Sequence, residues 1–374
     1  MKILHLYKDY YPILGGIENY IKMLAEAQAS EGHDVTVLVC DPGRKTKIEH
    51  LNGVRVIKAG RLFTAASMPI SLTQPLYLLR QRPDIVHIQL PFPLGAFTNW
   101  LIGRGKATVL SYQSDIVRDS QQKWLRYYGP FLRRILKAAD KIIVTTPHYI
   151  TVSKWLTPVA NKCTVVPIGV DTNRFSSRSD SVRTERNRDS ASPFQLLFIG
   201  RLRYYKGLDT LIKAMPNIPD THLTIGGTGP MKAEWEALTH ELGLTNRIRF
   251  IGDVPDEILP QQYQKADLFV LPANARSEAY GIVMVEAMAS GLPCITTELG
   301  TGTSWIVQDG VTGLVVAPNN VAELTDAVNT LRTSPDLREA FGKASQKRAK
   351  EHLSQEVMFT RINNIYQELA TASQ

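Results

Sequence analysis

The feature of this sequence that most constrains its fold is a repeated alternation of short apolar segments with segments of helical periodicity. The segments 2–6, 34–40 and 107–112 are apolar nearly throughout, which is typical of strands buried on both faces of a parallel sheet. Segment 17–29, between the first two, has apolar residues at helical spacing. The pattern predicts an α/β fold of the doubly wound type, with helices on both faces of the sheet.

The alternation stops once and then starts again. Residues 171–193 are polar and rich in Ser and Arg, which predicts a linker region. We therefore expect two Rossmann-like domains, over residues 1–170 and 194–353. A terminal helix over 354–374 is expected to pack back towards the first domain.

Composition narrows the class of protein. The chain has 374 residues and a formal net charge of +8, a length that suits two domains. No apolar run approaches the ~20 residues of a membrane-spanning helix, and the apolar start is too short for a signal peptide. The cysteines, Cys40, Cys163 and Cys294, are far apart and fit neither a disulfide framework nor a zinc site. We expect a cytoplasmic protein whose cysteines are core thiols.

Ligands of doubly wound domains bind at the carboxyl ends of the strands, so the loops after strands are candidate sites. Gly15 and Gly16 open the first helix, where free backbone N–H groups favour an anion such as phosphate. A plain strand-to-helix turn is the alternative. The loop lacks the G-x-G-x-x-G spacing of a dinucleotide site, which argues against a nicotinamide-dependent oxidoreductase.

The second domain opens with a glycine-bounded loop, residues 200–207. Its Arg201 and Lys206 can bring two cations to one anionic group, although solvated surface charge is the alternative. The next strand is followed by the turn 226–230, which contains Gly229. The glycines of this turn either let the backbone approach a ligand closely or allow tight packing.

Segment 277–291 is the most informative. Gly281 predicts the start of a helix whose first N–H groups, about 280–283, can bind a diphosphate. Glu278 lies just before that start. A carboxylate beside a phosphate site is unfavourable unless it has a task, such as accepting hydrogen bonds from sugar hydroxyls. Glu286 lies roughly two helical turns further on, at ~1.5 Å per residue, among apolar residues, and a buried carboxylate needs a partner such as a ribose diol. Helix capping and an internal ion pair are the alternatives.

Together these motifs resemble the retaining family 4 glycosyltransferases of the GT-B fold, over nearly the whole chain. The segments that carry this resemblance are 15–18, 200–207, 226–230, the pair Glu278 and Glu286, and 286–293. Segments 114–118, 145–150 and 298–305 resemble bacterial rhamnosyl- and mannosyltransferases of surface polysaccharide synthesis.

The resemblance implies transfer of a hexose from a nucleoside-diphosphate sugar to a saccharide or lipid-linked saccharide, with retention of configuration. The first domain would bind the acceptor and the second the donor. GDP-mannose is the expected donor; UDP-glucose-dependent glucosyl transfer and, more distantly, sugar-nucleotide epimerisation are the alternatives. We expect no cofactor and no metal, because the sequence has no Asp-x-Asp pair and cations with helix amides can stabilise the leaving group.

The resemblance also implies roles for single residues. The catalytic residues would be Glu278, Arg201, Lys206 and Gln113. The donor contacts would come from Gly15, Gly16, Gly229, Ala279, Tyr280, Gly281, Ile282 and Glu286. Asp115 is a candidate contact to the sugar or the acceptor, with capping of the following helix as the alternative.

The chain departs from the family at two strand ends. The family commonly carries His at the position of Gln113 and often at that of Gln89. Glutamine donates and accepts hydrogen bonds but cannot relay a proton near neutral pH. If the departing phosphate takes the acceptor proton, Gln113 need only hold the sugar, so we assign no general base.

A basic and aromatic cluster in the first domain bears on membrane binding. It comprises Arg118, Lys123, Trp124, Leu125, Arg126, Tyr127, Tyr128, Phe131, Leu132, Arg133, Arg134 and Lys137. Pro130 predicts a break into two short helices. The cluster can rest on anionic lipid, where a lipid-linked acceptor would lie; a solvated face and a noncatalytic membrane scaffold are the alternatives. Because no recognition motif accompanies the charge, we expect no nucleic-acid partner.

Overall fold

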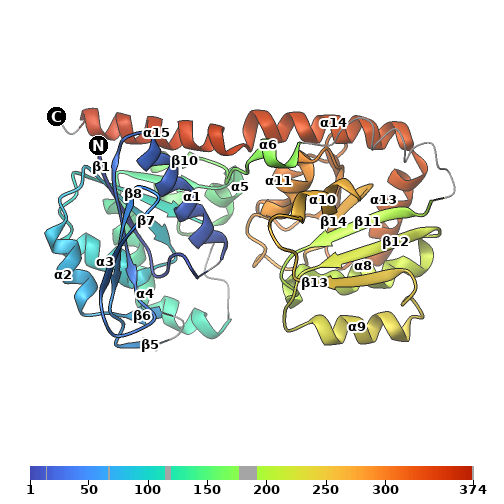
Figure 1. Cartoon of the computed structure of the whole chain (residues 1–374), viewed down its shortest axis with the longest axis horizontal. Helices are drawn as coiled ribbons and strands as arrows, with labels where there is room; N and C mark the ends of the chain where they lie inside the picture. Colours follow the sequence, from blue (N-terminus) through green and yellow to red (C-terminus); the bar gives the residue numbers. More distant parts are fainter. Residues whose placement is uncertain (14, 66–67, 114–118, 177–191, 373–374) are drawn as a thin grey trace. The chain divides into compact units, whose positions relative to one another are not determined.

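The computed structural model describes the whole chain except residues 14, 66–67, 114–118, 177–191 and 373–374, together with the side chains of 119–127. The chain divides into two compact units. Unit 1 comprises Met1–Val166 and Phe359–Gln374, and unit 2 comprises Pro167–Met358. Figure 1 shows that each unit has its own sheet with helices around it, which confirms the predicted α/β class.

The sheet of unit 1 has the strand order β10-β9-β8-β7-β1-β2-β4-β3. Its strands are β1 (Lys2–Leu6), β2 (Asp34–Cys40), β3 (Lys47–Leu51), β4 (Val54–Ala59), β7 (Ile85–Leu90), β8 (Ala107–Tyr112), β9 (Lys141–Val144) and β10 (Cys163–Val165). All neighbours pair in parallel except β3 and β4, which are antiparallel. A separate antiparallel hairpin joins β5 (Phe63–Ala65) and β6 (Met68–Ile70). The sequence did not predict β4, which pairs in parallel with β2, the antiparallel edge strand β3 or the hairpin.

The main helices of unit 1 are α1 (Gly16–Ser30), α2 (Thr73–Arg80), α3 (Pro93–Ile102), α4 (Asp119–Ala138), α5 (Pro147–Val152) and the part of α15 (Gln355–Ala372) from Phe359 on. The prediction that Pro130 breaks the chain into two helices is wrong, because α4 runs through it. Leu132, Ile135 and Leu136, which follow Pro130, are buried in the core. Their burial outweighs the one backbone hydrogen bond that proline removes.

The sheet of unit 2 is parallel throughout, in the order β13-β12-β11-β14-β15-β16. Its strands are β11 (Phe194–Ile199), β12 (Thr221–Gly226), β13 (Ile248–Gly252), β14 (Leu268–Leu271), β15 (Cys294–Thr297) and β16 (Gly313–Val316). The helices are α6 (Thr172–Phe175), α8 (Leu208–Ala214), α9 (Lys232–Glu241), α10 (Leu259–Gln264), α11 (Ile282–Ala289), α12 (Thr303–Ile306), α13 (Val321–Thr333) and α14 (Pro335–His352). Every predicted strand of this unit is present.

Helix α14 is the longest element that the sequence did not predict. Most of its residues are polar, and its few buried side chains include Phe341 and Ala349. Its start nevertheless has a local signal, because Pro335 is the first helical residue, a position that proline favours. The short helix α6 lies inside the predicted linker, where Asp171 caps it by accepting hydrogen bonds from the backbone N–H groups of Asn173 and Arg174.

Two further expectations can be compared with the structure. Cys40 and Cys294 are buried, whereas Cys163 is only half-buried, and all three are free thiols. The prediction of a core thiol is therefore wrong for Cys163, because it begins the edge strand β10. Within the described part of the chain, no helix is long and apolar enough to cross a bilayer.

Candidate active site

Two predicted site residues of unit 2 form a buried ion pair. Lys206 lies in the loop after β11, and Glu278 lies in the loop between β14 and α11. Because β11 and β14 are parallel neighbours, their following loops meet at the same sheet edge. The Nζ atom of Lys206 is 2.6 Å from Oε2 of Glu278, and each side chain is 9% exposed. The structure thus joins a cation and a carboxylate that come from separate motifs.

The loop that carries Lys206 is held by close backbone packing. Gly207 has φ +62°, and a Cβ atom there would collide with the carbonyl oxygen of Pro272. The backbone N–H of Asn274 donates to the carbonyl of Tyr205 over 3.0 Å. A left-handed residue without a side chain is therefore needed beside Lys206, which explains the glycine that ends this loop.

The other cation of the same loop has a different environment. Arg201 is exposed and makes no ion pair with a residue that the structure describes. Arg201 can therefore turn to a ligand, whereas Lys206 already contacts Glu278. The convergence of the two cations on one anion stays a prediction.

The turn with Gly229 packs directly against this loop. The backbone N–H of Leu202 donates to the carbonyl of Thr228 over 2.9 Å, and the N–H of Met231 donates to the carbonyl of Leu202 over 3.1 Å. A Cβ atom at Gly227 would collide with the carbonyl oxygen of Gly200. The two glycine motifs therefore form one continuous surface at the carboxyl ends of β11 and β12.

The start of α11 lies where the sequence predicted it. The helix begins at Ile282, directly after Gly281, which has φ +86°. The segment before it is fixed from one side by the loop after β15. Thr301 Oγ1 donates to the carbonyl of Glu278, and the N–H of Gly302 donates to the carbonyl of Ala279, each over 2.9 Å. These two hydrogen bonds fix the backbone that directly precedes the first N–H groups of α11.

Tyr280 uses its side chain for packing. Its ring is buried and its hydroxyl donates to the carbonyl of Ile168 over 2.8 Å. Burial raises the pKa of this hydroxyl far above its ordinary value. Only the backbone of Tyr280 is therefore a candidate for a ligand contact, as the sequence analysis proposed for this stretch.

Glu286 has a protein partner that the sequence did not reveal. Tyr263 of α10 donates its hydroxyl to Glu286 Oε2 over 2.7 Å. Burial raises the pKa of Glu286 to about 7, while the hydrogen bond from Tyr263 and the charge of Arg174 act in the opposite direction. The residue as a whole is half-buried.

In unit 1, the predicted residues lie at helix and strand ends. Gly15 caps α1 without a side-chain bond, and its carbonyl accepts from the N–H of Asn19 over 2.9 Å. No atom lies within 4 Å of a Cβ placed at Gly16, so space is open there.

Gln113 follows β8, is buried, and donates its Nε2 to Oε1 of Gln89 over 3.0 Å. Asp115 lies outside the described residues.

Comparison with known proteins identifies the family. Two family models match in succession, Glycosyltransferase Family 4 over residues 14–174 and Glycosyl transferases group 1 over residues 183–348. The O-antigen chain mannosyltransferase C of Escherichia coli is 33% identical over 98% of both chains. The D-rhamnosyltransferase WbpZ of Pseudomonas aeruginosa is 34% identical over 94% of this chain and 92% of its own. The chain is a family 4 glycosyltransferase.

Solved structures show the fold of this glycosyltransferase. Sucrose-phosphate synthase from Thermosynechococcus elongatus has a TM-score of 0.79 at 24% identity and covers 99% of both chains. The Anabaena protein HepE in complex with UDP has a TM-score of 0.78 at 21% identity, over 98% of this chain and 100% of its own. The predicted GT-B fold is confirmed, and the family leaves no support for a nicotinamide oxidoreductase or a noncatalytic scaffold.

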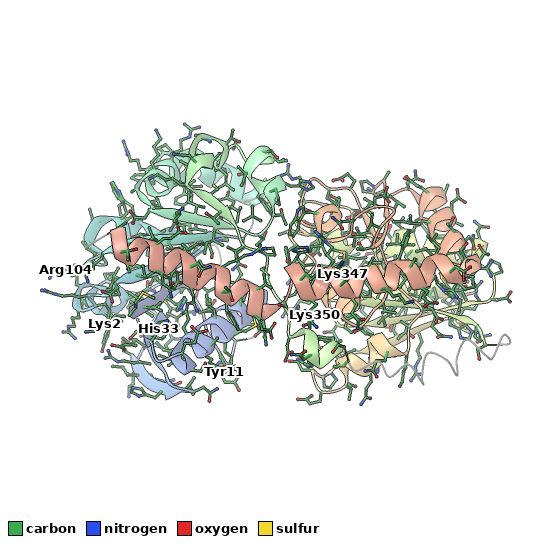
Figure 2. All side chains as sticks on the ribbon, turned by 90° about the horizontal axis from the view of Figure 1, so that it is seen from above. Lys2, Tyr11, His33, Arg104, Lys347 and Lys350 are labelled. Atoms are coloured by element: carbon green, nitrogen blue, oxygen red, sulfur yellow. The ribbon has the colours of Figure 1, made fainter. Side chains whose placement is uncertain are left out.

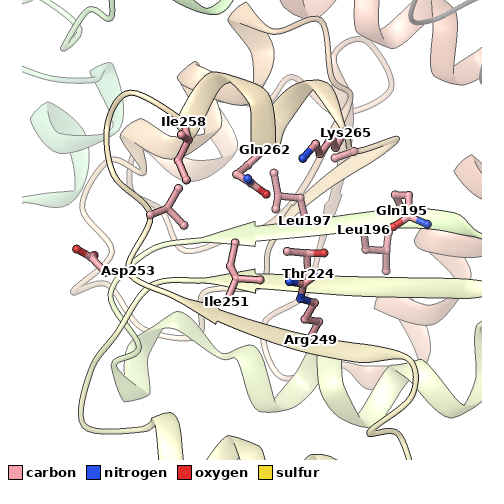
Figure 3. A pocket seen from close by; sticks show the side chains of 12 residues that line it. Gln195, Leu196, Leu197, Thr224, Arg249, Ile251, Asp253, Ile258, Gln262 and Lys265 are labelled. Carbon is pink, nitrogen blue, oxygen red and sulfur yellow. The ribbon is translucent and has the colours of Figure 1, made fainter.

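Two of the surface cavities in the described part of the glycosyltransferase are not lined by the predicted site residues. One, of about 350 Å³, lies over β11, β12, β13 and α10 in unit 2. Figure 3 shows Arg249, Thr224 and Lys265 among its lining side chains. The other, of about 200 Å³, lies between α3 and α4 of unit 1. Neither of these two cavities is lined by Glu278, Lys206 or Gln113.

Two residues of the glycosyltransferase that contact candidate site residues were not assigned a role from the sequence. Tyr263, the partner of Glu286, lies in a six-residue helix with no distinguishing motif. Gln89 was noted only as a departure from the family, yet it contacts Gln113 directly. Among the described residues, no group of three or more His, Cys, Asp or Glu side chains is arranged to hold a metal ion.

Proposed function

We propose that this glycosyltransferase moves a hexose from a nucleoside-diphosphate sugar to a saccharide or lipid-linked saccharide in surface polysaccharide synthesis, with retention of the anomeric configuration. The observation that carries the proposal is the buried pair of Lys206 and Glu278 next to the start of α11. It places a cation, a carboxylate and free helix N–H groups at one sheet edge of unit 2. These are the groups that a sugar attached to a diphosphate requires.

In this proposal the leaving diphosphate is stabilised by charge. The Nζ atom of Lys206 and the guanidinium of Arg201 lie on the loop after β11, and the N–H groups of Gly281 and Ile282 add partial positive charge. Such preorganised donors stabilise the charge that develops on the leaving phosphate. This contribution makes a metal ion unnecessary, and we propose transfer without one.

The carboxylates would recognise the sugar parts of the donor. Glu278 has one oxygen on Lys206, which leaves the other for hexose hydroxyls. Glu286, held by Tyr263, would accept hydrogen bonds from the ribose. Gly229, Gly15 and Gly16 would allow backbone approach to the donor, and the amide of Gln113 would hold the transferred sugar.

The donor sugar is proposed from the relatives. The Escherichia coli relative, 33% identical, is described as an O-antigen chain mannosyltransferase, and this favours mannose from GDP-mannose. UDP-glucose is the second candidate, because no described side chain of the site distinguishes guanine from uracil.

Unit 1 has a face that favours binding at the inner face of a membrane. Arg133, Arg134 and Lys137 of α4 are exposed, and Phe131 beside them is 40% exposed. On α3, which contacts α4, Trp100 is 43% and Leu101 64% exposed. Arg104, which follows α3, points away from the unit in Figure 2. We propose that these cations and apolar side chains rest on anionic lipid, where a lipid-linked acceptor lies.

The first experiment is a donor panel with the purified full chain. Nucleoside-diphosphate release would be measured from GDP-mannose, UDP-glucose, UDP-galactose, UDP-N-acetylglucosamine and GDP-fucose, with bacterial lipid extract as acceptor, with and without EDTA. We expect turnover of GDP-mannose that EDTA does not change. Turnover of UDP-glucose alone would reverse the donor assignment, and loss of turnover in EDTA would contradict the metal-free mechanism.

A further inference from the structure

Three adjacent strand ends of unit 1 carry a row of uncharged polar side chains. Gln89 lies in β7, Gln113 follows β8 and Thr145 follows β9. The strands are in register, with Gln89 opposite Ser111 and Tyr112 opposite Val144. Continuing this register puts Gln113 beside Thr145 on the face that also carries Gln89. All three side chains are buried, with exposures of 0%, 7% and 3% for Gln89, Gln113 and Thr145.

The bond between the two glutamines has a direction. Gln113 donates its Nε2 to Oε1 of Gln89 over 3.0 Å. The nitrogen end of Gln113 is therefore occupied, and its carbonyl oxygen, Oε1, is the end that remains for a ligand. The Nε2 atom of Gln89 and the Oγ1 atom of Thr145 are buried without a hydrogen-bond partner. The row thus has polar atoms without a hydrogen-bond partner at the carboxyl ends of the strands, where ligands of doubly wound domains bind.

A second set of polar contacts lies on the same face of the sheet. His87 Nε2 is 2.7 Å from Ser111 Oγ, and His87 Nδ1 is 2.6 Å from the hydroxyl of Tyr366 on α15. His5 Nε2 is 2.7 Å from Gln28 Oε1 on α1. These bonds connect the central strands to two helices of unit 1.

The two amides set each other's orientation. If Gln89 alone turned by half a rotation about its last bond, its NH2 group would face the NH2 group of Gln113, and two donors would oppose each other. Turning both would restore a bond but would present the Gln113 nitrogen, and not its oxygen, to a ligand. The orientation of Gln89 therefore decides whether Gln113 accepts or donates.

We propose that Gln89 is a positioning residue that holds the Gln113 amide with its carbonyl oxygen presented to a hydroxyl group of a neutral sugar. The inference rests on the proposed function and adds to it a residue without an assigned role. Neither amide titrates near neutral pH. The contact to the sugar is consequently an uncharged hydrogen bond whose strength does not change between mildly acidic and mildly basic conditions.

The test compares Gln89→Leu with Gln89→Glu in the full-length enzyme. Leucine removes the acceptor, so Gln113 can rotate, and we expect kcat to fall by ~10-fold or more with the donor KM and the melting temperature unchanged. Ionised glutamate can only accept, so Gln89→Glu is expected to regain most of the wild-type kcat at pH values where its carboxyl group is ionised. The wild-type kcat is expected to have no such pH dependence.

Gln28→Leu is the matched control. It removes another buried amide of unit 1, bonded to His5, and is expected to lower stability without a selective loss of kcat. Wild-type kcat in Gln89→Leu would overturn the inference. So would a folded Gln89→Glu enzyme that is inactive at every pH, because the Gln113 amide would then be reversed. A loss of activity that only follows a lower melting temperature would show a merely structural role.

A measurement without turnover separates this inference from the proposed function. In protein labelled with 15N-glutamine, the side-chain amide signal of Gln113 can be assigned with Gln113→Leu and followed during titration with methyl α-D-mannoside. We expect it to shift in the wild type and not in Gln89→Leu. A signal that stays in place in both proteins would overturn the inference even in an active enzyme. Failure of the whole donor panel would instead count against the proposed function alone.

Discussion

Lys206 and Glu278 follow different strands, yet Nζ of the lysine lies 2.6 Å from Oε2 of the glutamate, in surroundings where each side chain is only 9% exposed. The sequence analysis assigned the lysine to the diphosphate and the glutamate to the hexose. The ion pair shows that each is also the other's electrostatic partner. Under the proposed function, we therefore expect a change at either position to alter both stability and turnover.

Removing one member of this pair should destabilise the fold. Lys206→Met leaves a buried carboxylate without its cation, and we expect the free energy of unfolding to fall by about 3 kcal/mol. In the double variant Lys206→Met/Glu278→Gln no unpaired charge remains, so the loss should be smaller than in Lys206→Met. Urea denaturation of the single and double variants measures the difference. Equal losses in the two proteins would show that an unpaired Glu278 carboxylate is not what destabilises Lys206→Met.

The same two residues should control turnover. We expect Glu278→Gln and Lys206→Ala each to lower kcat by ~100-fold or more, because each removes a charged contact at the reacting sugar or its leaving group. The measurement is nucleoside-diphosphate release under conditions where circular dichroism shows a folded protein. Ordinary turnover in either variant would contradict the site assignment.

Glu286 should make stability depend on pH. Burial raises its pKa from 4.5 to about 7 in the folded protein, so between these values the folded state keeps a proton that the unfolded state has lost. Stability should therefore fall as pH rises from 4.5 to 7, by roughly 2 to 3 kcal/mol. Glu286→Gln should lack this component. The check is the difference in unfolding free energy between the two proteins at several pH values; a constant difference would show that folding does not shift the pKa of Glu286.

Gln113→His tests the family departure directly. We expect the variant to stay active, because imidazole can also hold a sugar hydroxyl, but to gain a pH dependence near its ordinary pKa of about 6.5. The wild type should have none from this position. The pH profile of kcat distinguishes them, and complete inactivation of a folded variant would show that the amide is specifically required.

The cations of α4 should control binding to lipid. The triple variant Arg133→Gln/Arg134→Gln/Lys137→Gln is expected to bind vesicles of phosphatidylglycerol about 100-fold more weakly, at about 1 kcal/mol per cation. The matched control replaces Lys343, Lys347 and Lys350 of α14, which are also exposed; the last two are labelled in Figure 2. Sedimentation with vesicles measures both. Equal weakening would show that only net charge matters.

Gly207 and Gly291 provide a matched pair of backbone tests. Both have positive φ, +62° and +74°, but an added Cβ collides with the Pro272 carbonyl only at Gly207, and nothing lies within 4 Å of one at Gly291. Gly291→Ala should cost about 1 kcal/mol of stability, as a left-handed alanine does. Gly207→Ala should cost clearly more and lower turnover, because the loop of Lys206 must shift. Equal costs in thermal unfolding would contradict the packing argument.

The sequence by itself determined the local features of this protein. Apolar runs between helical segments identified most strands of both sheets, though not β3 or β4, because strands buried on two faces carry mainly apolar residues. Positions that need a glycine, such as 207 and 281, could be found because their conformation depends on a few neighbouring residues. The motifs that resemble a glycosyltransferase family are of the same local kind, since each lies on a single loop.

The tertiary structure decided which residues from segments distant along the chain contact each other. The pairing of Lys206 with Glu278, the bond from Tyr263 that holds Glu286, and the direction of the bond between Gln113 and Gln89 depend on which strands are neighbours. Helix α4 passes through Pro130 because buried side chains beyond it outweigh a local penalty. Burial and partner choice are properties of packing, which no spacing along one segment encodes, and they determine the charge and orientation of the groups in the site.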